Sequence, residues 1–244
     1  MGYKYEMHTH DRIGSKCGSF TPEQLVDTFL SQGYTGIFST NHFFCGNTAA
    51  PGPEKEWKYR LEKFCDAYRA VKAEGDKRGL DVFFGFEYTV PHSLDPIANN
   101  AGCDFLVFGV DEKWLENYGG DVESCPTRQY LNRIREAGGT VIQAHPYREA
   151  SYIDHIRLFP RCIHGAEVYN ARRTDFENAL AEQYCENYHL VRFAGTDNHS
   201  GGGAYPYAGM ATDEPIGSER EFIDAVRSGR AKPFAMDENG VRLI

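Results

Sequence analysis

Short apolar runs alternate along the chain with longer segments in which apolar residues recur every three or four positions. The short runs predict β-strands, whereas the three-to-four spacing predicts amphipathic helices. The expected strands cover residues 5–10, 34–40, 81–87, 105–110, 140–144, 165–169, 190–194, 208–212 and 232–236. The expected helices cover residues 21–33, 54–78, 126–137, 152–158, 173–188 and 218–228.

Two of these helices carry clear start signals. Thr21 suits the N-cap of the first helix, Pro22 its first turn, and Gln24 the third position of a capping box. Gly33 is placed to end that helix. Ser218 suits the N-cap of the helix that we expect over residues 218–228.

Strand and helix follow one another throughout the chain, without a linker, repeat or low-complexity tract. This order favours parallel strands with helices packed outside them. A length of 244 residues fits one large α/β barrel. We therefore expect a single domain over residues 1–244, of the α/β class, with about seven βα units in a closed or slightly distorted barrel.

Composition and charge limit the functions and partners that we expect for this chain. Hydrophobic residues make up 41% and charged residues 25% of the chain, as in ordinary soluble proteins. No apolar run approaches the roughly 20 residues that span a bilayer, and the first strand leaves no room for a signal peptide. We expect a cytoplasmic protein without a membrane partner. The net charge of −9 disfavours long nucleic acid as a partner but allows a small anionic substrate.

The seven cysteines form no Cys-x-x-Cys pair. In a reducing compartment they are expected to be free thiols that serve mostly as small packing residues.

Histidine and carboxylate side chains recur where the expected strands end. His8 and His10 point to the same face if residues 5–10 form a strand, although an isolated His-x-His pair is often only a polar strand end. The full set of strand-end residues is His8, His10, His42, Glu87, His145, Asp197 and His199.

In parallel α/β architectures the carboxyl ends of the strands face one rim, so these side chains should converge in space. Histidine with carboxylate suits zinc, manganese or iron. More than four ligands indicates two or three divalent ions, with a carboxylate such as Glu87 bridging. Such sites activate water for hydrolysis.

An ordered set of motifs resembles the PHP (polymerase and histidinol phosphatase) family over nearly the whole chain. The motifs are His8-Thr9-His10, Thr21-Pro22-Glu23-Gln24-Leu25, Gly36-Ile37-Phe38-Ser39-Thr40-Asn41-His42, Gly85-Phe86-Glu87, Val141-Ile142-Gln143-Ala144-His145-Pro146 and Ala194-Gly195-Thr196-Asp197-Asn198-His199. The resemblance implies a distorted (β/α)7, TIM-like barrel and a metal-dependent phosphoesterase, with the metal site at the carboxyl ends of the strands.

The resemblance also implies a role for each matching position. The first metal would be held by His8, His10, Glu87 and Asp197. Glu87 would bridge to a second metal, which His145 also binds, and His42 and His199 would belong to a third.

Two positions depart from the family pattern. Where a loop Asp or His is usual, this chain has Cys17, with Asp11 as a less favoured substitute. Cys17 is either a thiolate ligand of the third metal or a loop thiol that touches no metal. Where a histidine usually opens the strand before the second-metal site, this chain has Asp104, which is either a ligand or a cap.

Phosphate esters usually need a cation besides the metals. The candidates are Arg148, Arg172 and Arg173, each of which could instead be a solvated surface residue, and Lys16 is a weaker one. Further residues that follow strand ends could line the site or pack in the core: Tyr88, Tyr147 and Tyr169. Glu167 resembles a structural carboxylate of the family, and His92 is the remaining histidine nearest to the motifs.

These observations support three hypotheses. The first is hydrolysis of a small-molecule phosphomonoester by a metal-bridging hydroxide, without a protein nucleophile, with histidinol phosphate as the named substrate that the resemblance suggests. The second is action on a phosphodiester, nucleotide bisphosphate or phosphotyrosine at the same site. The third is a metal-binding module without catalysis. The sequence leaves the oligomeric state open.

Overall fold

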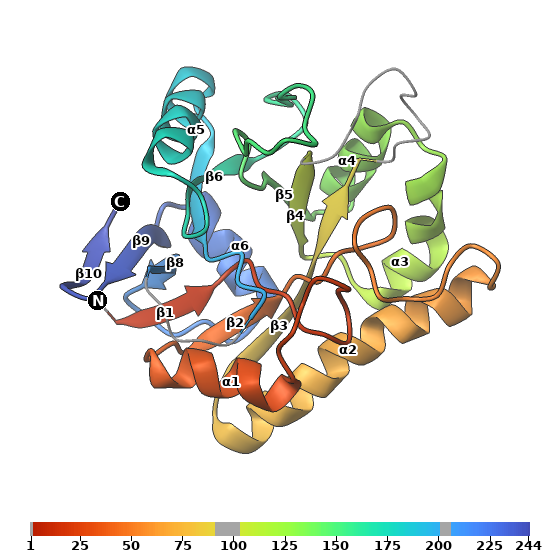
Figure 1. Ribbon diagram of the computed structural model, residues 1–244, viewed down its shortest axis with the longest axis horizontal. Helices are drawn as coiled ribbons and strands as arrows, with labels where there is room; N and C mark the ends of the chain where they lie inside the picture. Colours follow the sequence, from red (N-terminus) through yellow and green to blue (C-terminus); the bar gives the residue numbers. More distant parts are fainter. Residues whose placement is uncertain (1, 91–102, 201–205) are drawn as a thin grey trace.

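A curled sheet forms the centre of the computed structural model, which describes residues 2–90, 103–200 and 206–244 (Figure 1). The strands are β1 (Tyr3–Glu6), β2 (Gly36–Ser39), β3 (Asp81–Thr89), β4 (Asp104–Phe108), β5 (Thr140–Gln143), β6 (Gly165–Asn170), β7 (Val191–Gly195), β8 (Tyr207–Thr212), β9 (Lys232–Asp237) and β10 (Gly240–Leu243). Within the described residues they lie in the order β10-β9-β8-β1-β2-β3-β4-β5-β6-β7. The α/β class is confirmed.

Helices pack against both faces of this curled sheet. They are α1 (Pro22–Ser31), α2 (Trp57–Arg78), α3 (Glu112–Tyr118), α4 (Thr127–Glu136), α5 (Asp175–Tyr188) and α6 (Glu219–Arg227), with a 3₁₀-helix over Gly119–Glu123. Five of the six expected helices are present. The sequence interpretation missed α3 and the 3₁₀-helix.

The helix expected over residues 152–158 is absent, and this prediction was wrong. The side chain of Gln143 explains why. Its amide nitrogen donates to Arg157 O at 2.7 Å, and its amide oxygen accepts from Phe159 N at 3.2 Å. Because these backbone groups bond to a side chain on β5, the segment is held in an irregular conformation.

The expected helix caps are confirmed. Thr21 accepts from the backbone of Gln24, whose side chain accepts from the backbone of Thr21, as a capping box requires. Gly33 has a φ of +70° just after α1, which a residue with a Cβ rarely adopts. Ser218 accepts from Glu221 N at the start of α6.

The strand directions differ from the parallel arrangement that we expected. β1, β2 and β3 are parallel neighbours, as are β5, β6 and β7. β4 runs antiparallel to both β3 and β5, and β8, β9 and β10 add further antiparallel pairs. Apolar runs report burial and not direction, so the sequence pattern could not reveal these reversals. The count of seven parallel βα units is therefore not reproduced by the strands of the described residues.

The ends of β1 and β7 meet at one rim of the curled sheet. Thr9, just beyond β1, forms an isolated parallel bridge with Asn198, just beyond β7. The amide of His10 donates to Asn198 O at 3.0 Å. Residues far apart in the sequence are thereby brought side by side at the rim where the candidate ligands lie.

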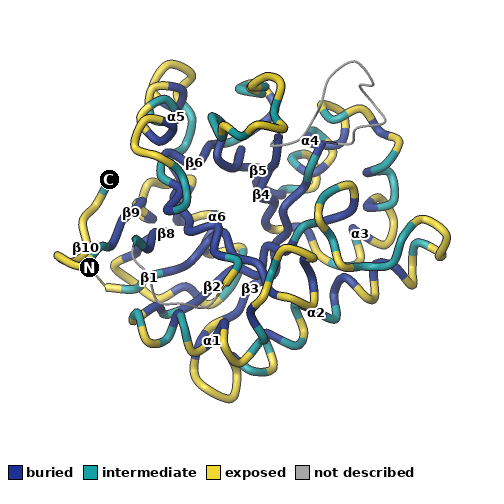
Figure 2. Tube along the Cα trace, viewed as in Figure 1, coloured by how far each residue is buried: buried dark blue, intermediate teal, exposed yellow. Residues whose placement is uncertain are grey.

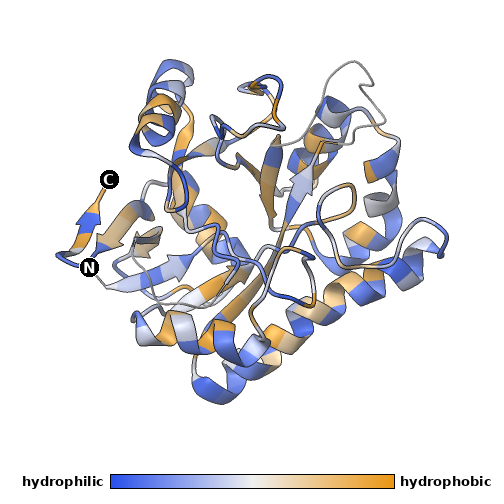
Figure 3. Cartoon of the chain, in the orientation of Figure 1, coloured by the Kyte–Doolittle hydropathy of each residue, from blue (hydrophilic) through white to orange (hydrophobic). Residues whose placement is uncertain are grey.

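Aromatic side chains fill the space between the sheet and its helices. Phe38 lies within 5.1 Å of Phe83, 5.0 Å of Phe108 and 4.8 Å of Phe222, measured between ring centroids. Figure 2 shows that the central strands are largely buried whereas β10 is exposed, and Figure 3 shows that α2 carries polar residues among its apolar ones. None of the helices in the described ranges combines the length and the apolarity that a membrane span needs.

Candidate metal centre

Glu87 lies at the centre of the strand-end residues. Its Oε1 atom lies 3.3 Å from His8 Nε2 and 3.4 Å from His145 Nε2. Its Oε2 atom lies 2.7 Å from His42 Nδ1 and 3.4 Å from His10 Nε2. Four imidazoles from three different strand ends therefore surround one carboxylate, which suits a bridging ligand.

Asp197 approaches the same group from the end of β7. Its Oδ1 atom lies 3.4 Å from His8 Nε2 and 3.5 Å from His10 Nε2. His199 follows it closely, with Nδ1 3.5 Å from Asp197 Oδ1. The structure thus brings together all seven residues that the strand-end pattern singled out.

Two of these residues have unusual backbone conformations. His145 has a φ of +27° and Asp197 a φ of +53°, a region that non-glycine residues seldom occupy. Such conformations persist only where the surrounding structure enforces them, and they cluster at functional sites. Both residues stand just after a strand, where the chain turns toward the centre.

The local hydrogen bonds explain how β3 places Glu87. The strand continues to Thr89, so Glu87 does not close it as the sequence suggested. Glu87 N donates to Asn41 O at 3.0 Å, and Phe43 N donates to Glu87 O at 2.7 Å. The strand-like pairing of residues 41–43 with β3 therefore fixes Glu87 beside His42.

Several ligand atoms at this centre are buried and lack a hydrogen-bond partner within the described residues. They are His8 Nε2, His10 Nε2, His42 Nδ1 and both carboxylate oxygens of Glu87. Burying polar atoms without partners is costly, and bound metal ions would supply the missing partners. The residues therefore fit divalent metal ions, which imidazole and carboxylate bind well.

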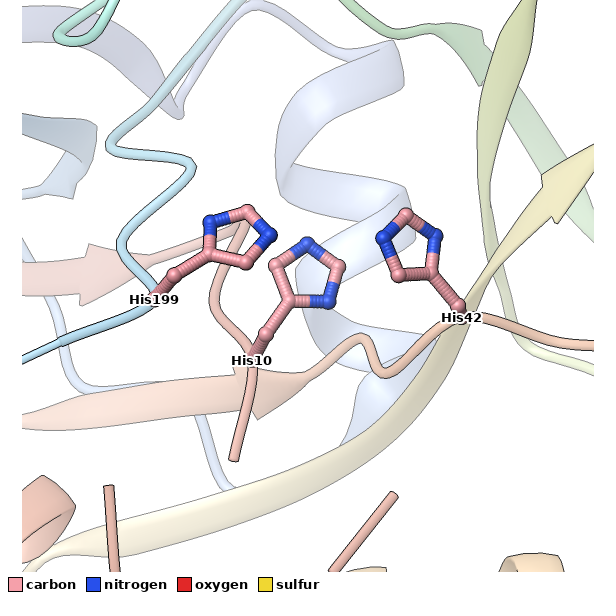
Figure 4. A group of neighbouring side chains, drawn as sticks. All are labelled: His10, His42 and His199. Atoms are coloured by element: carbon pink, nitrogen blue, oxygen red, sulfur yellow. The ribbon is translucent and has the colours of Figure 1, made fainter. Parts of the chain in front are cut away.

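Four overlapping groups among the described residues have ligand atoms close enough to share an ion. The groups are His8–His10–Glu87, His8–His145–Asp197, Glu87–Asp104–His145 and His10–His42–His199. Figure 4 shows the last group, whose three imidazoles lie side by side. The ring of His10 is centred 4.5 Å from that of His42 and 4.2 Å from that of His199.

Neighbouring carboxylates orient the histidines from behind. Glu167 Oε1 lies 2.9 Å from His8 Nδ1, and Glu167 Oε2 accepts from His145 N at 2.9 Å. Glu6 Oε1 accepts from His8 N at 2.7 Å and from Thr196 N at 2.9 Å. The sequence interpretation missed Glu6, the last residue of β1, which lies two residues before His8.

The buried charges shift the pKa values of the cluster in opposite directions. Burial opposes the charged form of His8, but the carboxylates of Glu167, Asp197 and Glu87 raise its pKa well above the ordinary value. Burial also opposes the charged form of Glu87, but the imidazoles of His42 and His8 lower its pKa well below the ordinary value. Burial and the neighbouring His42 lower the pKa of His10 to about 3.

Cys17 lies beside the group of His10, His42 and His199 but is not part of it. The residue is exposed. Partial burial of the thiol would raise its pKa, but hydrogen bonds with His199 and His42 lower the pKa to about 6. No group of close ligand atoms among the described residues includes Cys17 or Asp11. Asp11 instead accepts from Ile13 N at 2.8 Å, which stabilises the loop. A metal-binding role for Cys17 stays a prediction.

Asp104 reaches the centre because β4 is antiparallel. The residue opens β4, and the reversed direction places the start of this strand at the rim where the parallel strands end. Asp104 Oδ2 lies 4.0 Å from His145 Nε2, and Oδ1 accepts from Thr89 Oγ1 at 2.6 Å. The aspartate is thus placed as a ligand would be.

A cavity of about 650 Å³ opens above the cluster. Its lining includes Glu87, Asp104, His145 and Asp197 together with three arginines, Arg148, Arg172 and Arg173. Among the described residues, the lining also includes Tyr152, which the sequence interpretation missed, and does not include Lys16.

The three tyrosines expected beyond strand ends do not line the described part of this cavity, and Tyr88 and Tyr169 lie within β3 and β6. Tyr88 is buried and its hydroxyl donates to Thr127 Oγ1 at 3.4 Å. Tyr147 packs near Tyr184, and Tyr169 lies beneath Arg242. His92 falls outside the described residues.

No family model and no curated protein matches the chain. Solved structures do share its fold. A two-domain protein from Bacteroides vulgatus, containing a predicted PHP-like metal-dependent phosphoesterase, aligns with a TM-score of 0.64 at 17% identity, over 96% of this chain and 64% of that one. The chain has a PHP-like fold.

Two further structures share the PHP-like fold. A candidate metal-dependent phosphoesterase from Bifidobacterium adolescentis aligns with a TM-score of 0.54 at 12% identity, over 92% of this chain and 96% of that one. A lesion-specific endonuclease from Pyrococcus furiosus aligns with a TM-score of 0.56 at 11% identity, over 97% of this chain and 59% of that one. The chain thus spans less than two thirds of the Bacteroides and Pyrococcus proteins.

Proposed function

We propose that this PHP-like chain is a metal-dependent phosphoric-ester hydrolase that acts on small phosphomonoesters. The observation that carries the proposal is the set of buried, unpartnered ligand atoms around Glu87 at the base of an arginine-lined cavity. The PHP-like phosphoesterases among the structural neighbours agree with it.

The proposed metal ligands combine the close groups of side chains with the roles that the family resemblance implies. A first ion would be held by His8, His10, Glu87 and Asp197; a second by Glu87, Asp104 and His145; a third by His42 and His199, with Cys17 as a further candidate. Bound divalent ions of this kind lower the pKa of water and neutralise charge on phosphoryl oxygens. The ligand types suit zinc, manganese or iron.

The protein itself orients and neutralises the substrate. Arg172 Nη2 donates to Asn198 Oδ1 at 3.4 Å, which places this guanidinium beside the loop that carries Asp197 and His199. From there it can bind the non-reacting oxygens of a phosphoryl group, because guanidinium matches phosphate geometry. The mechanism requires no protein nucleophile.

A small substrate fits the charge of the chain. The net charge of −9 repels a long polyanion, whereas the three arginines concentrate positive charge in one cavity. The seven cysteines are all free, which agrees with a reducing, cytoplasmic location.

The test combines metal analysis with phosphate release from a panel of phosphorylated metabolites, histidinol phosphate among them. The His8→Ala and Asp197→Asn variants should lose bound metal and turnover together. His189→Asn is the matched control, because His189 is exposed and its φ of +53° suits Asn. Variants that lose metal but keep full turnover contradict the proposal.

A phosphodiesterase is the second candidate. It is favoured by the structural likeness to the Pyrococcus endonuclease, and the same metals would serve it. Comparing the hydrolysis of bis-p-nitrophenyl phosphate with that of p-nitrophenyl phosphate separates the two activities. A nucleotide bisphosphate or phosphotyrosine as substrate would emerge from the metabolite panel.

A metal-binding module without catalysis remains the third reading, motivated by Cys17 and Asp104. It predicts bound metal and no phosphate release from any ester of the panel. Counting the bound ions cannot distinguish such a module from a hydrolase, but measuring phosphate release can.

A further inference from the structure

Two of the cavity arginines, Arg148 and Arg173, lie in turns that follow the neighbouring strands β5 and β6. Arg148 follows His145 in a turn in which Arg148 N donates to His145 O at 2.9 Å. Arg173 lies in a similar turn after β6, with its amide donating to Asn170 O at 3.0 Å. Both side chains line the cavity.

The carboxylate of Glu177 holds these two turns together. Its Oε1 atom accepts from Glu149 N at 2.7 Å, and its Oε2 atom accepts from Thr174 N at 2.7 Å. Glu149 and Thr174 are the immediate neighbours of Arg148 and Arg173. A single buried carboxylate therefore joins the two turns that carry Arg148 and Arg173.

Each of these two arginines has a donor atom without a hydrogen-bond partner among the described residues. The Nε atoms of Arg148 and Arg173 are buried and have no hydrogen-bond partner within the described residues. Arg148 donates through Nη2 to Tyr152, while Arg173 Nη1 lies 3.9 Å from Glu177 Oε1, too far for a hydrogen bond. Guanidinium groups with free donors are suited to bidentate binding of a carboxylate or phosphate.

We propose that Arg148 and Arg173 bind a second anionic group of the substrate, apart from the phosphoryl group that is hydrolysed. The assignment rests on the proposed function, in which the reacting phosphoryl is neutralised by the metal centre and Arg172. Two further guanidinium groups in the same cavity exceed what one phosphate needs. The substrate class is therefore a small phosphomonoester that carries a second phosphate or a carboxylate.

Binding of stable analogues to the metal-loaded protein tests this assignment without turnover. Calorimetry would compare propylphosphonate with the α,ω-alkane diphosphonates of three to six carbons. We expect the diphosphonates to bind tenfold to a hundredfold more tightly, the range given by hydrogen bonds to charged groups, with an optimum chain length. Arg148→Met and Arg173→Met should each remove this preference while leaving propylphosphonate binding within about threefold.

Arg128→Ala is the control, because Arg128 is exposed on α4 and does not line the cavity. Equal binding of mono- and diphosphonates to the wild type overturns the assignment, as does a preference that survives both Arg→Met changes. Hydrolysis of the matching diol mono- and bisphosphates is measured alongside. Arg-dependent diphosphonate binding without any hydrolysis would support the assignment while contradicting the proposed hydrolase function.

Discussion

The Nδ1 atom of His8 lies 2.9 Å from the Oε1 atom of Glu167, and both side chains are buried. A carboxylate oxygen accepts, so His8 donates to it through Nδ1, and in the neutral imidazole form that ligates metals the Nε2 lone pair would face Glu87 and Asp197. Metal-binding histidines commonly have such a carboxylate behind them, because it fixes the tautomer and the ring orientation.

Glu167→Gln should therefore weaken metal binding by about tenfold to a hundredfold, although Glu167 is proposed to bind no metal itself. The change removes the negative charge behind His8 but keeps the size of the side chain. Titration of the metal-free protein with zinc or manganese measures the effect. Glu186→Gln, an exposed substitution on α5, is the control. Unchanged affinity in Glu167→Gln would show that this pair does not orient a ligand.

Asp104→Ala should lower the number of bound ions by one per chain, because Asp104 completes the group with Glu87 and His145. Asp104→His should keep that ion, since imidazole is also a good ligand. Elemental analysis after equilibration with excess metal and desalting measures the count. Asp224→Ala, on the exposed side of α6, should keep the wild-type count. An unchanged count in Asp104→Ala would assign this aspartate to a purely structural role.

Cys17 should be the most reactive thiol of the metal-free protein at pH 7. Hydrogen bonds with His199 and His42 lower its pKa to about 6, so most of it is thiolate, whereas burial raises the pKa of Cys45 to about 12. Both cysteines line the same cavity, so Cys45 serves as the internal control.

Peptide mapping after brief treatment with iodoacetamide should find Cys17 alkylated at least about tenfold faster than Cys45. Added zinc should slow the reaction if the thiolate is a ligand. Equal alkylation of the two residues would contradict the geometry around Cys17.

His164 should make the metal-free protein less stable at acidic pH. Its Nδ1 atom accepts from Val141 N at 3.1 Å, and burial, with help from Arg227 and Arg135, lowers its pKa to about 4. As pH falls, the unfolded state therefore takes up the proton first, starting near the ordinary histidine pKa of 6.5. The stability contributed by neutral His164 is complete above about pH 6.5 and is lost as pH falls toward 4.

The expected loss is about 1–2 kcal/mol, after a reduction for the partial exposure of the ring. His164→Asn keeps an acceptor for Val141 N but does not titrate. Chemical denaturation at pH 7 and pH 5 should show a smaller pH effect in this variant. A pH effect equal to that of the wild type would exclude His164 as its source.

Local signals in the sequence predicted much of the fold. The capping box of Thr21 and Gln24 formed as expected, since it depends only on neighbouring residues. Periodicity could not predict strand direction, so the reversal of β4 came from the structure alone. The missing helix at residues 152–158 depends on Gln143, a contact between distant parts of the chain that no local pattern reports.

The candidate site was predictable where its residues stand at strand ends. His8, Glu87 and Asp197 converge as their positions implied. The pairing of Arg148 with Arg173 was not predictable, because Glu177 joins the two turns across 28 residues of sequence. Contacts of this kind, between turns that are distant in the sequence, depend on tertiary packing rather than on motifs.

The central claim is that the cluster around Glu87 holds the ions that make this chain a phosphoesterase. The most direct measurement is phosphate release from the metabolite panel by the metal-free protein, before and after reconstitution to a measured number of ions per chain. Phosphate release is expected only after reconstitution, with two or three ions bound per chain. Full phosphatase activity in the metal-free protein would contradict it.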